Sequence, residues 1–309
     1  MLGLYFLFAR ATLVGACGIL TALCLTVMIS CCSPRNLLPP PTKAAVRAIA
    51  ELESIGCRCE WWYDILLGKP VVSVSQRFFS ADDVNNAFSI MARHNVDFVI
   101  SLEQGTMPKS ATIPGSVKRC EWLDVTVPVG ATFVFEDIVD FELTRSSIGA
   151  GIIFDFSACK RLSGLKIYDN RGDRQFQTIL DKMVDLRNLY MENYCAEALD
   201  HIPASTRLIR LLVSHYRGDT SRINRLLACN DGRMLFVALC DSNIDHQTIE
   251  LLASLPYLGM LWLKDLDLPS TAYEPLRHCK ASYIEFDNVL VSEELVTRLR
   301  AKGCAVGFK

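Results

Sequence analysis

Apolar residues return along the second half of the chain with a nearly constant period. The segment 162–170 carries apolar residues at its first, fourth and sixth positions and asparagine at its ninth. The sixth position has counterparts in seven units, at residues 143, 167, 191, 213, 239, 263 and 286, in steps of 24, 24, 22, 26, 24 and 23 residues. Such self-similarity predicts that one structural unit is stacked on the next, with a core shared between neighbours.

Each unit predicts a short strand followed by a second element. In Leu165-Lys166-Ile167, alternation directs the two apolar side chains into the core and the lysine to the opposite face. Helical spacing follows the strand in two units, at 179–184 and 249–255. We therefore expect an α/β fold in which a curved parallel sheet carries helices on its convex side.

This pattern resembles that of the leucine-rich-repeat family, whose repeats are about 20 to 29 residues long. The resemblance covers roughly residues 117–309 and implies a solenoid, but no catalytic residue or cofactor. Only Asn170 keeps the asparagine of the family pattern; serine, tyrosine, leucine or valine replaces it in the other units. With its hydrophobic N-terminus, the chain is similar to bacterial membrane-anchored proteins of this family.

Weaker forms of the pattern precede the clear repeats. A helix over 44–55 and an alternating strand over 57–63 predict an N-terminal cap, because terminal repeats are atypical. The expected segments are a hydrophobic segment at 1–33, a proline-rich tether at 34–43, the N-terminal helix-strand cap at 44–70, and repeats over 71–309, of which 71–130 are degenerate, 138–291 are clear and 292–309 form a C-terminal cap.

The N-terminal segment predicts a membrane attachment. Residues 11–32 contain no charged side chain. At about 1.5 Å per residue such a helix spans about 33 Å, which is enough to cross a bilayer core. Two interpretations stay open, an uncleaved signal-anchor helix and a lipoprotein signal in which Met28-Ile29-Ser30 precedes a lipidated Cys31. In both, the protein is held at a membrane, single-pass or lipid-anchored, and we expect the repeats on the extracytoplasmic side.

Charge and cysteine content exclude several classes of function. The 309 residues include 32 basic and 34 acidic side chains, for a net charge of −2, which argues against nucleic acid as a partner. Four of the 13 cysteines lie in or beside the hydrophobic segment, which leaves nine. An odd number cannot form a complete set of internal disulfides, and the spacing suits no zinc site. We expect these cysteines to be packing residues, and we expect no metal or cofactor.

The residues of each strand that point away from the core predict a binding face on the concave side of the sheet. Exposed aromatic residues are enriched at binding hot spots, and acidic residues recur just after the strands. Lys166 and Glu285 are expected on the same face, exposed to solvent. The candidate partner-binding residues are Tyr168, Tyr190, Phe236, Met260, Trp262, Tyr283, Asp241 and Asp265.

The function expected from these features is a non-enzymatic module that binds a protein or peptide ligand. Two alternatives stay open. One is a structural envelope protein whose repeats assemble laterally without a discrete ligand. The other is an enzyme that uses Cys240, His215 and Asp241, although no nucleophile, nucleotide or metalloprotease motif is present.

Overall fold

The computed structural model describes residues 38–168, 170–172, 176–180, 186–192, 202, 207–230 and 232–309. The predicted membrane segment at 1–33 and the first part of the tether, residues 34–37, lie outside the described residues. Across the described ranges, none of the helices has both the length and the apolar character needed to cross a bilayer.

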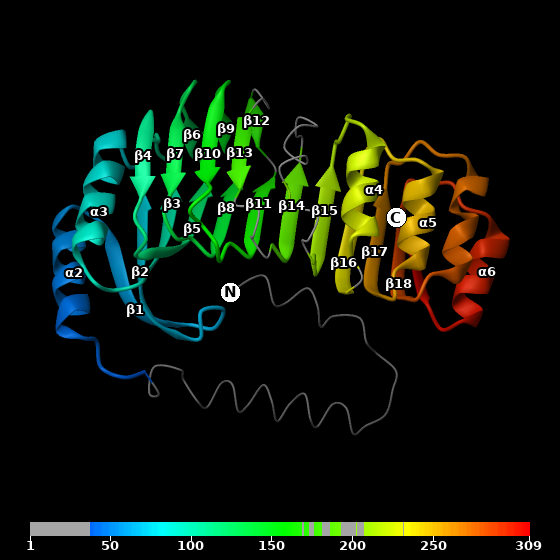
Figure 1. Cartoon of the computed structure of the whole chain (residues 1–309), viewed down its shortest axis with the longest axis horizontal. Helices are drawn as coiled ribbons and strands as arrows, with labels where there is room; N and C mark the ends of the chain where they lie inside the picture. Colours follow the sequence, from blue (N-terminus) through cyan, green and yellow to red (C-terminus); the bar gives the residue numbers. More distant parts are fainter. Residues whose placement is uncertain are drawn as a thin grey trace.

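A large, mostly parallel sheet organises the chain. Its twelve strands lie in the order of the sequence (Figure 1). Only the first pair, β1 with β2, is antiparallel, and every following pair is parallel. The strands are β1 (Arg58–Asp64), β2 (Lys69–Arg77), β3 (Phe98–Glu103), β5 (Val117–Leu123), β8 (Asp140–Thr144), β11 (Gly164–Tyr168), β14 (Asn188–Glu192), β15 (Arg210–Ser214), β16 (Arg233–Cys240), β17 (Tyr257–Lys264), β18 (Ala281–Asp287) and β19 (Ala305–Phe308). The predicted α/β class is confirmed.

The register of the sheet follows the period of the sequence. Tyr190 pairs with Lys166 on one side and Leu212 on the other, and Trp262 lies between Ala238 and Glu285. The apolar residues on either side of each of these positions point into the core. Leu165 is 1% exposed and Leu261 is fully buried, so the predicted alternation of faces is confirmed.

A second layer covers one face of the sheet (Figure 1). Within this layer, each element contacts the next, from α2 to β13 and again from α4 to α6. Its elements are α2 (Lys43–Ser54), α3 (Ala81–Arg93), β4 (Ser110–Ile113), β7 (Thr132–Phe135), β10 (Ile152–Phe156), β13 (Phe176–Leu180), α4 (Thr220–Ala228), α5 (His246–Ser254), the 3-10 helix η3 (Ser270–His278) and α6 (Glu293–Ala301). These elements and the inward strand residues share one hydrophobic core.

The prediction that helices alone cover this face is wrong in the middle of the molecule. There β4, β7, β10 and β13 form a four-stranded parallel sheet, and β13 occupies part of the segment expected to be helical. Alternating phenylalanines explain the difference, because side chains at every second position point to one face of a strand. The rings of Phe133 and Phe141 lie 4.8 and 5.1 Å from that of Trp122, which is fully buried.

Among the described residues, a left-handed residue follows each strand of the twelve-stranded sheet from β2 to β18, except β11 and β14, whose next residues lie outside the described ranges. Non-glycine residues rarely adopt positive φ, and aspartate and asparagine do so more readily than most. At six of these positions, all but Arg145 and Asn288, the backbone N–H donates to the last carbonyl of the neighbouring strand, as from Asp241 to Lys264 over 2.8 Å. The residues are Phe78, Gln104, Asp124, Arg145, His215, Asp241, Asp265 and Asn288.

Beyond these turns a three-stranded ribbon of β6 (Thr126–Val127), β9 (Ser147–Ile148) and β12 (Arg171–Gly172) continues the stacking. Side chains satisfy the backbone here in place of the missing asparagines. Ser146 Oγ accepts a hydrogen bond from Val125 N (3.1 Å), and Ser242 Oγ accepts one from Tyr216 N (3.2 Å). Asn170 donates to Leu143 O over 3.0 Å. Each of these bonds ties one strand turn to the next.

Candidate binding face

The face of the twelve-stranded sheet opposite the second layer is the candidate site, called here the outer face. Its central row consists of the residues between the two buried positions of each strand. From β11 to β18 the row is Lys166, Tyr190, Leu212, Ala238, Trp262 and Glu285. Neighbouring strands lie about 4.8 Å apart, so the apolar stretch from Tyr190 to Trp262 is about 14 Å long.

The two predicted tyrosines contact each other. The rings of Tyr168 and Tyr190 meet edge to face, with their centroids 6.3 Å apart. Tyr168 Oη donates to Glu142 Oε1 over 2.7 Å. Burial and the hydrogen bond to the Glu142 carboxylate raise the pKa of Tyr168 well above its ordinary value. This tyrosine therefore stays neutral and is held in place, which suits a rigid contact surface.

The second predicted group forms an ordered row of its own. Phe236, Met260 and Tyr283 are direct neighbours across β16, β17 and β18, and all three are partly exposed. This row lies two positions before the central row on each strand. The strand β15 alone separates this group from the tyrosine pair, and its Leu212 connects the two along the central row.

Trp262 has a distinctive environment. Its neighbour across the sheet, Ala238, is small and fully buried. The ammonium groups of Lys264 and Lys309 lie 5.9 and 5.7 Å from its ring. Its Nε1 is buried and has no hydrogen-bond partner among the described residues. A partly exposed aromatic ring next to a small residue, with cations beside it, can receive an apolar side chain of a partner.

The expectation that Glu285 is exposed is wrong. It is 6% exposed, and it accepts a hydrogen bond from Tyr283 Oη over 3.2 Å and pairs with Lys309 Nζ over 2.6 Å. Tyr283 and Lys309 thus both contact its carboxylate. The hydrogen bond and charge of Glu285 raise the pKa of Lys309. This carboxylate fixes the lysine beside Trp262.

Lys166 is also less free than expected, since its side chain is only 19% exposed. Its Nζ lies 3.2 Å from both Asp140 and Glu142. Burial by itself lowers the pKa of Lys166, but the two carboxylates outweigh it, so the pKa lies above its ordinary value. The part of the outer face before the tyrosines is thus a network of paired charges.

Asp241 and Asp265 lie at the rim of the sheet and not on the outer face proper. Both are left-handed turn residues, and together with Arg217 and Asp267 they line a hollow of about 410 Å³. Asp241 accepts hydrogen bonds from Arg217, and its Oδ2 lies 2.6 Å from His215 Nδ1. Hydrogen bonds from Arg217 and then His215 lower the pKa of Asp241. Turn geometry accounts for the acidic residue type here.

Of the three residues in the enzyme alternative, His215 and Asp241 are paired through their side chains. Cys240 precedes Asp241 at the end of β16 and is 8% exposed. Its backbone carbonyl accepts hydrogen bonds from His215 N and from Ser242 Oγ, over 2.9 and 2.7 Å. Through its backbone, Cys240 therefore takes part in the hydrogen bonds that join the neighbouring turns.

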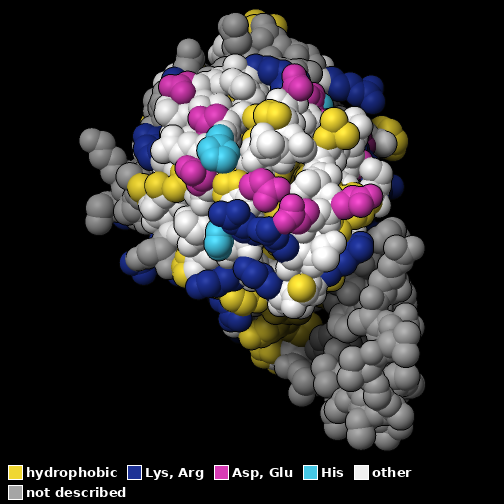
Figure 2. All heavy atoms as spheres, turned by 90° about the vertical axis from the view of Figure 1, so that its right-hand side faces the viewer, with side chains coloured by type: hydrophobic (Ala, Val, Ile, Leu, Met, Phe, Trp, Pro, Cys, Tyr) yellow, Lys and Arg dark blue, Asp and Glu magenta, His cyan; other side chains and the backbone are white. Residues whose placement is uncertain are grey.

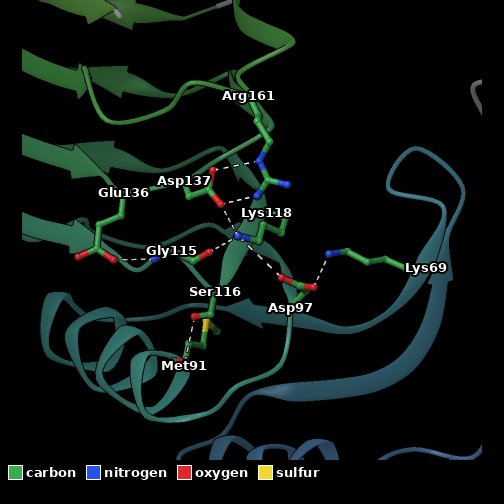
Figure 3. A network of polar contacts seen from close by, with 9 residues as sticks. All are labelled: Lys69, Met91, Asp97, Gly115, Ser116, Lys118, Glu136, Asp137 and Arg161. Carbon is green, nitrogen blue, oxygen red and sulfur yellow. Dashed lines mark hydrogen bonds and ion pairs between the residues drawn. The ribbon is translucent and has the colours of Figure 1, made fainter. Parts of the chain in front are cut away.

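The sequence did not point to a polar network at the end of the sheet where β3, β5 and β8 begin (Figure 3). The buried Lys118 Nζ lies 2.7 Å from Asp137 and 3.8 Å from Asp97. Arg161 pairs with the same Asp137, and Lys69 pairs with Asp97 over 2.5 Å. The network borders a hollow of about 530 Å³. Two carboxylates are shared among three cations, and these ion pairs join neighbouring strands.

Within the described ranges, no group of three or more histidine, cysteine or acidic residues could hold a metal ion. Burial raises the pKa of the Cys57 thiol to about 11, and that of Cys159 to about 12, so these thiols stay protonated. The sequence matches no family model and no curated protein.

Proposed function

We propose that this chain is a membrane-tethered leucine-rich-repeat protein that binds a protein or peptide ligand on the outer face of its sheet, without catalysing a reaction. One observation carries the proposal. The apolar residues Tyr190, Leu212, Ala238 and Trp262 stand in register on four consecutive strands, on the face that the second layer leaves uncovered. Three of these residues, Tyr190, Leu212 and Trp262, are partly exposed and can contact an extended partner, while Ala238 lies buried between them.

The rigidity of the anchoring side chains favours specific binding. Tyr168 is held by Glu142, and Trp262 is flanked by two lysines that are fixed by carboxylates: Lys264 Nζ lies 3.1 Å from Asp287, and Lys309 pairs with Glu285. Side chains that are already ordered lose little conformational entropy on association. The charged pairs at both ends of the apolar row supply the polar rim that is usual around a binding hot spot.

Discrete binding is favoured over the alternative of an envelope protein whose repeats assemble laterally. Figure 2 shows basic, acidic and histidine side chains intermingled at the C-terminal end of the molecule. There α6 carries Glu293 and Glu294 in its first turn and Arg298 and Arg300 in its last. A polar outer surface is typical of the terminal unit of a repeat array, which has to remain soluble.

Site-specific photo-cross-linking tests the proposal. A photoreactive phenylalanine analogue replaces Leu212 at the centre of the row, and in a matched control it replaces the exposed Glu293 on α6. We expect one discrete adduct from position 212 in membranes of the source cells, and none from position 293. The Trp262→Ala change in the same chain should weaken the adduct. Adducts from position 293 alone, or a ladder of self-adducts, would favour lateral assembly.

A further inference from the structure

The closed end of the β1–β2 hairpin presents an apolar tip to solvent. Ile65 is 84% exposed and Leu66 is 72% exposed, and behind them Trp62 and Tyr63 are 44% and 40% exposed. Ile65 and Leu66 are adjacent on the turn, so the two most exposed surfaces are contiguous. Clustered apolar exposure of this kind marks an interaction site more often than isolated exposed residues do.

The tip is held in this exposed shape. Asp64 is 3% exposed, and its Oδ1 accepts hydrogen bonds from the backbone N–H groups of Leu66 and Leu67, over 2.8 and 3.0 Å. Its Oδ2 accepts one from Arg119 on β5 over 2.7 Å. Tyr63 Oη donates to the carbonyl of Gly68 over 2.9 Å. The turn is therefore fixed to the sheet and cannot easily fold its apolar side chains inward.

The same bonds prepare the turn for an environment that is poor in water. A backbone N–H without a partner is costly in a lipid phase, where no water can accept its hydrogen bond. Asp64 satisfies two of these groups at the tip, and Gly68 with φ +65° closes the turn without steric strain. The outermost surface of the turn is left to Ile65 and Leu66.

The length of the chain before the described residues places this tip near the predicted membrane segment. Only residues 33–37 separate the uncharged segment 11–32 from Leu38. An extended chain of that length reaches about 20 Å. The described end of the tether contacts the hairpin, because Trp61 Nε1 donates to Pro39 O over 2.9 Å. In Figure 1 the tip and the start of α2 lie on the same lower side of the molecule.

We infer that the β1–β2 tip inserts Ile65 and Leu66 into the interfacial region of the lipid bilayer, with Trp62 and Tyr63 at the level of the headgroups. The inference rests on the proposed membrane tether and deepens it, since it gives the repeats a defined orientation on the membrane. Tryptophan and tyrosine are the side chains enriched at that level. Exposed basic residues at the start of α2, Lys43 and Arg47, suit the anionic headgroups nearby.

Fluorescence quenching by brominated lipid tests the inference on the full chain. The chain is reconstituted in phosphatidylcholine vesicles brominated near the headgroup. Of its tryptophans, Trp122 is fully buried in the core, whereas Trp62 lies at the tip. We expect a quenched component that disappears in Trp62→Phe and falls by about half or more in the double variant Ile65→Ser/Leu66→Ser. The matched control is Leu290→Ser, which alters an 80% exposed leucine elsewhere and should leave the quenching unchanged.

Flotation of the same samples separates the possible failures. If the chain floats with the vesicles but Trp62 is not quenched, the tip inference is overturned while the tether stands. If the chain does not float, the tether and this inference fall together, whereas the outer face is unaffected. If Trp62 is unquenched, and the chain is a dimer in detergent whereas the double variant is a monomer, the tip binds a second copy of the chain. Because both serines replace exposed residues, unchanged thermal unfolding of the double variant serves as the folding control.

Discussion

Arg119 on β5 donates a hydrogen bond to Asp64 at the base of the β1–β2 tip over 2.7 Å, although 55 residues separate the two. The guanidinium also lies 3.6 Å from Asp140 on β8. Burial by itself lowers the pKa of Arg119, but the hydrogen bond and charge of Asp64 outweigh it, so the pKa is raised. This contact joins the hairpin to the paired charges of the outer face.

The first prediction concerns that contact. Replacing Arg119 with methionine leaves the buried carboxylate of Asp64 without its charged partner, and should lower the free energy of unfolding by about 2 to 3 kcal/mol. The matched control is Arg145→Met, which breaks a more exposed pair with Asp124 and should cost less than about 1 kcal/mol. Denaturant unfolding measures both values. Equal small losses would mean that Arg119 does not hold the hairpin.

A second prediction tests the two faces of the strands. Leu261→Ala removes a fully buried side chain and should cost about 2 to 5 kcal/mol. Leu212→Ala shortens a partly exposed side chain on the outer face and should cost about 1 kcal/mol or less. Thermal unfolding of the two variants gives the comparison. Similar losses would contradict the assignment of faces, because a shift of one residue exchanges them.

A third prediction uses the contact between Gly164 and Asp140. A Cβ atom at Gly164 would lie 1.7 Å from Asp140 Oδ1, so Gly164→Ala must displace the carboxylate from Lys166 and Arg119. We expect a loss of about 1 to 3 kcal/mol. In an Asp140→Ala background the same change should be nearly neutral, as a double-mutant cycle would record. Gly232→Ala, whose nearest atom lies at 3.4 Å, is the control. Additive losses would show that the two positions do not interact.

A fourth prediction concerns pH and Asp137. Burial alone would raise the pKa of this carboxyl, but Arg161 and Lys118 outweigh it, and the pKa lies below its ordinary value. A lowered pKa in the folded state stabilises the fold above the ordinary carboxyl value of about 3.9, and this contribution is lost as the pH falls through the lowered pKa. Asp137→Asn should therefore reduce stability at pH 7, and the difference from the unmodified chain should shrink toward about pH 2. A difference that does not depend on pH would exclude this electrostatic role.

The sequence period predicted the sheet and its register well because the strands are local and repetitive. The alternation in Leu165-Lys166-Ile167 was enough to assign both faces. It did not predict the four-stranded sheet of the second layer, since Ile179 and Leu180 are consistent with helical spacing as well as with a strand. The phenylalanines of the neighbouring strands favour the strand, because Phe154 on β10 contacts Phe176 on β13 edge to face, with ring centroids 5.6 Å apart.

The site was predicted only in part. The register brought Phe236, Met260 and Tyr283 together as expected, because pairing in a parallel sheet follows directly from the repeat length. The network around Lys118 and the pairing of Glu285 with Lys309 could not be predicted, since each depends on the direction of long side chains. The acidic residue type at Asp241 has its explanation in backbone conformation, which the spacing of apolar residues does not report.

The central claim is that the outer face binds a partner through Trp262, and the affinity of the cross-linked ligand for the Trp262→Ala variant tests it most directly. Truncating a central interface tryptophan typically costs about 2 kcal/mol or more, so Kd should rise roughly thirtyfold. The melting temperature should fall by no more than a few degrees, because the ring points away from the core. Leu290→Ala, at an exposed site elsewhere, should change neither quantity. An unchanged Kd together with a large loss of stability would place Trp262 among the structural residues and contradict the account.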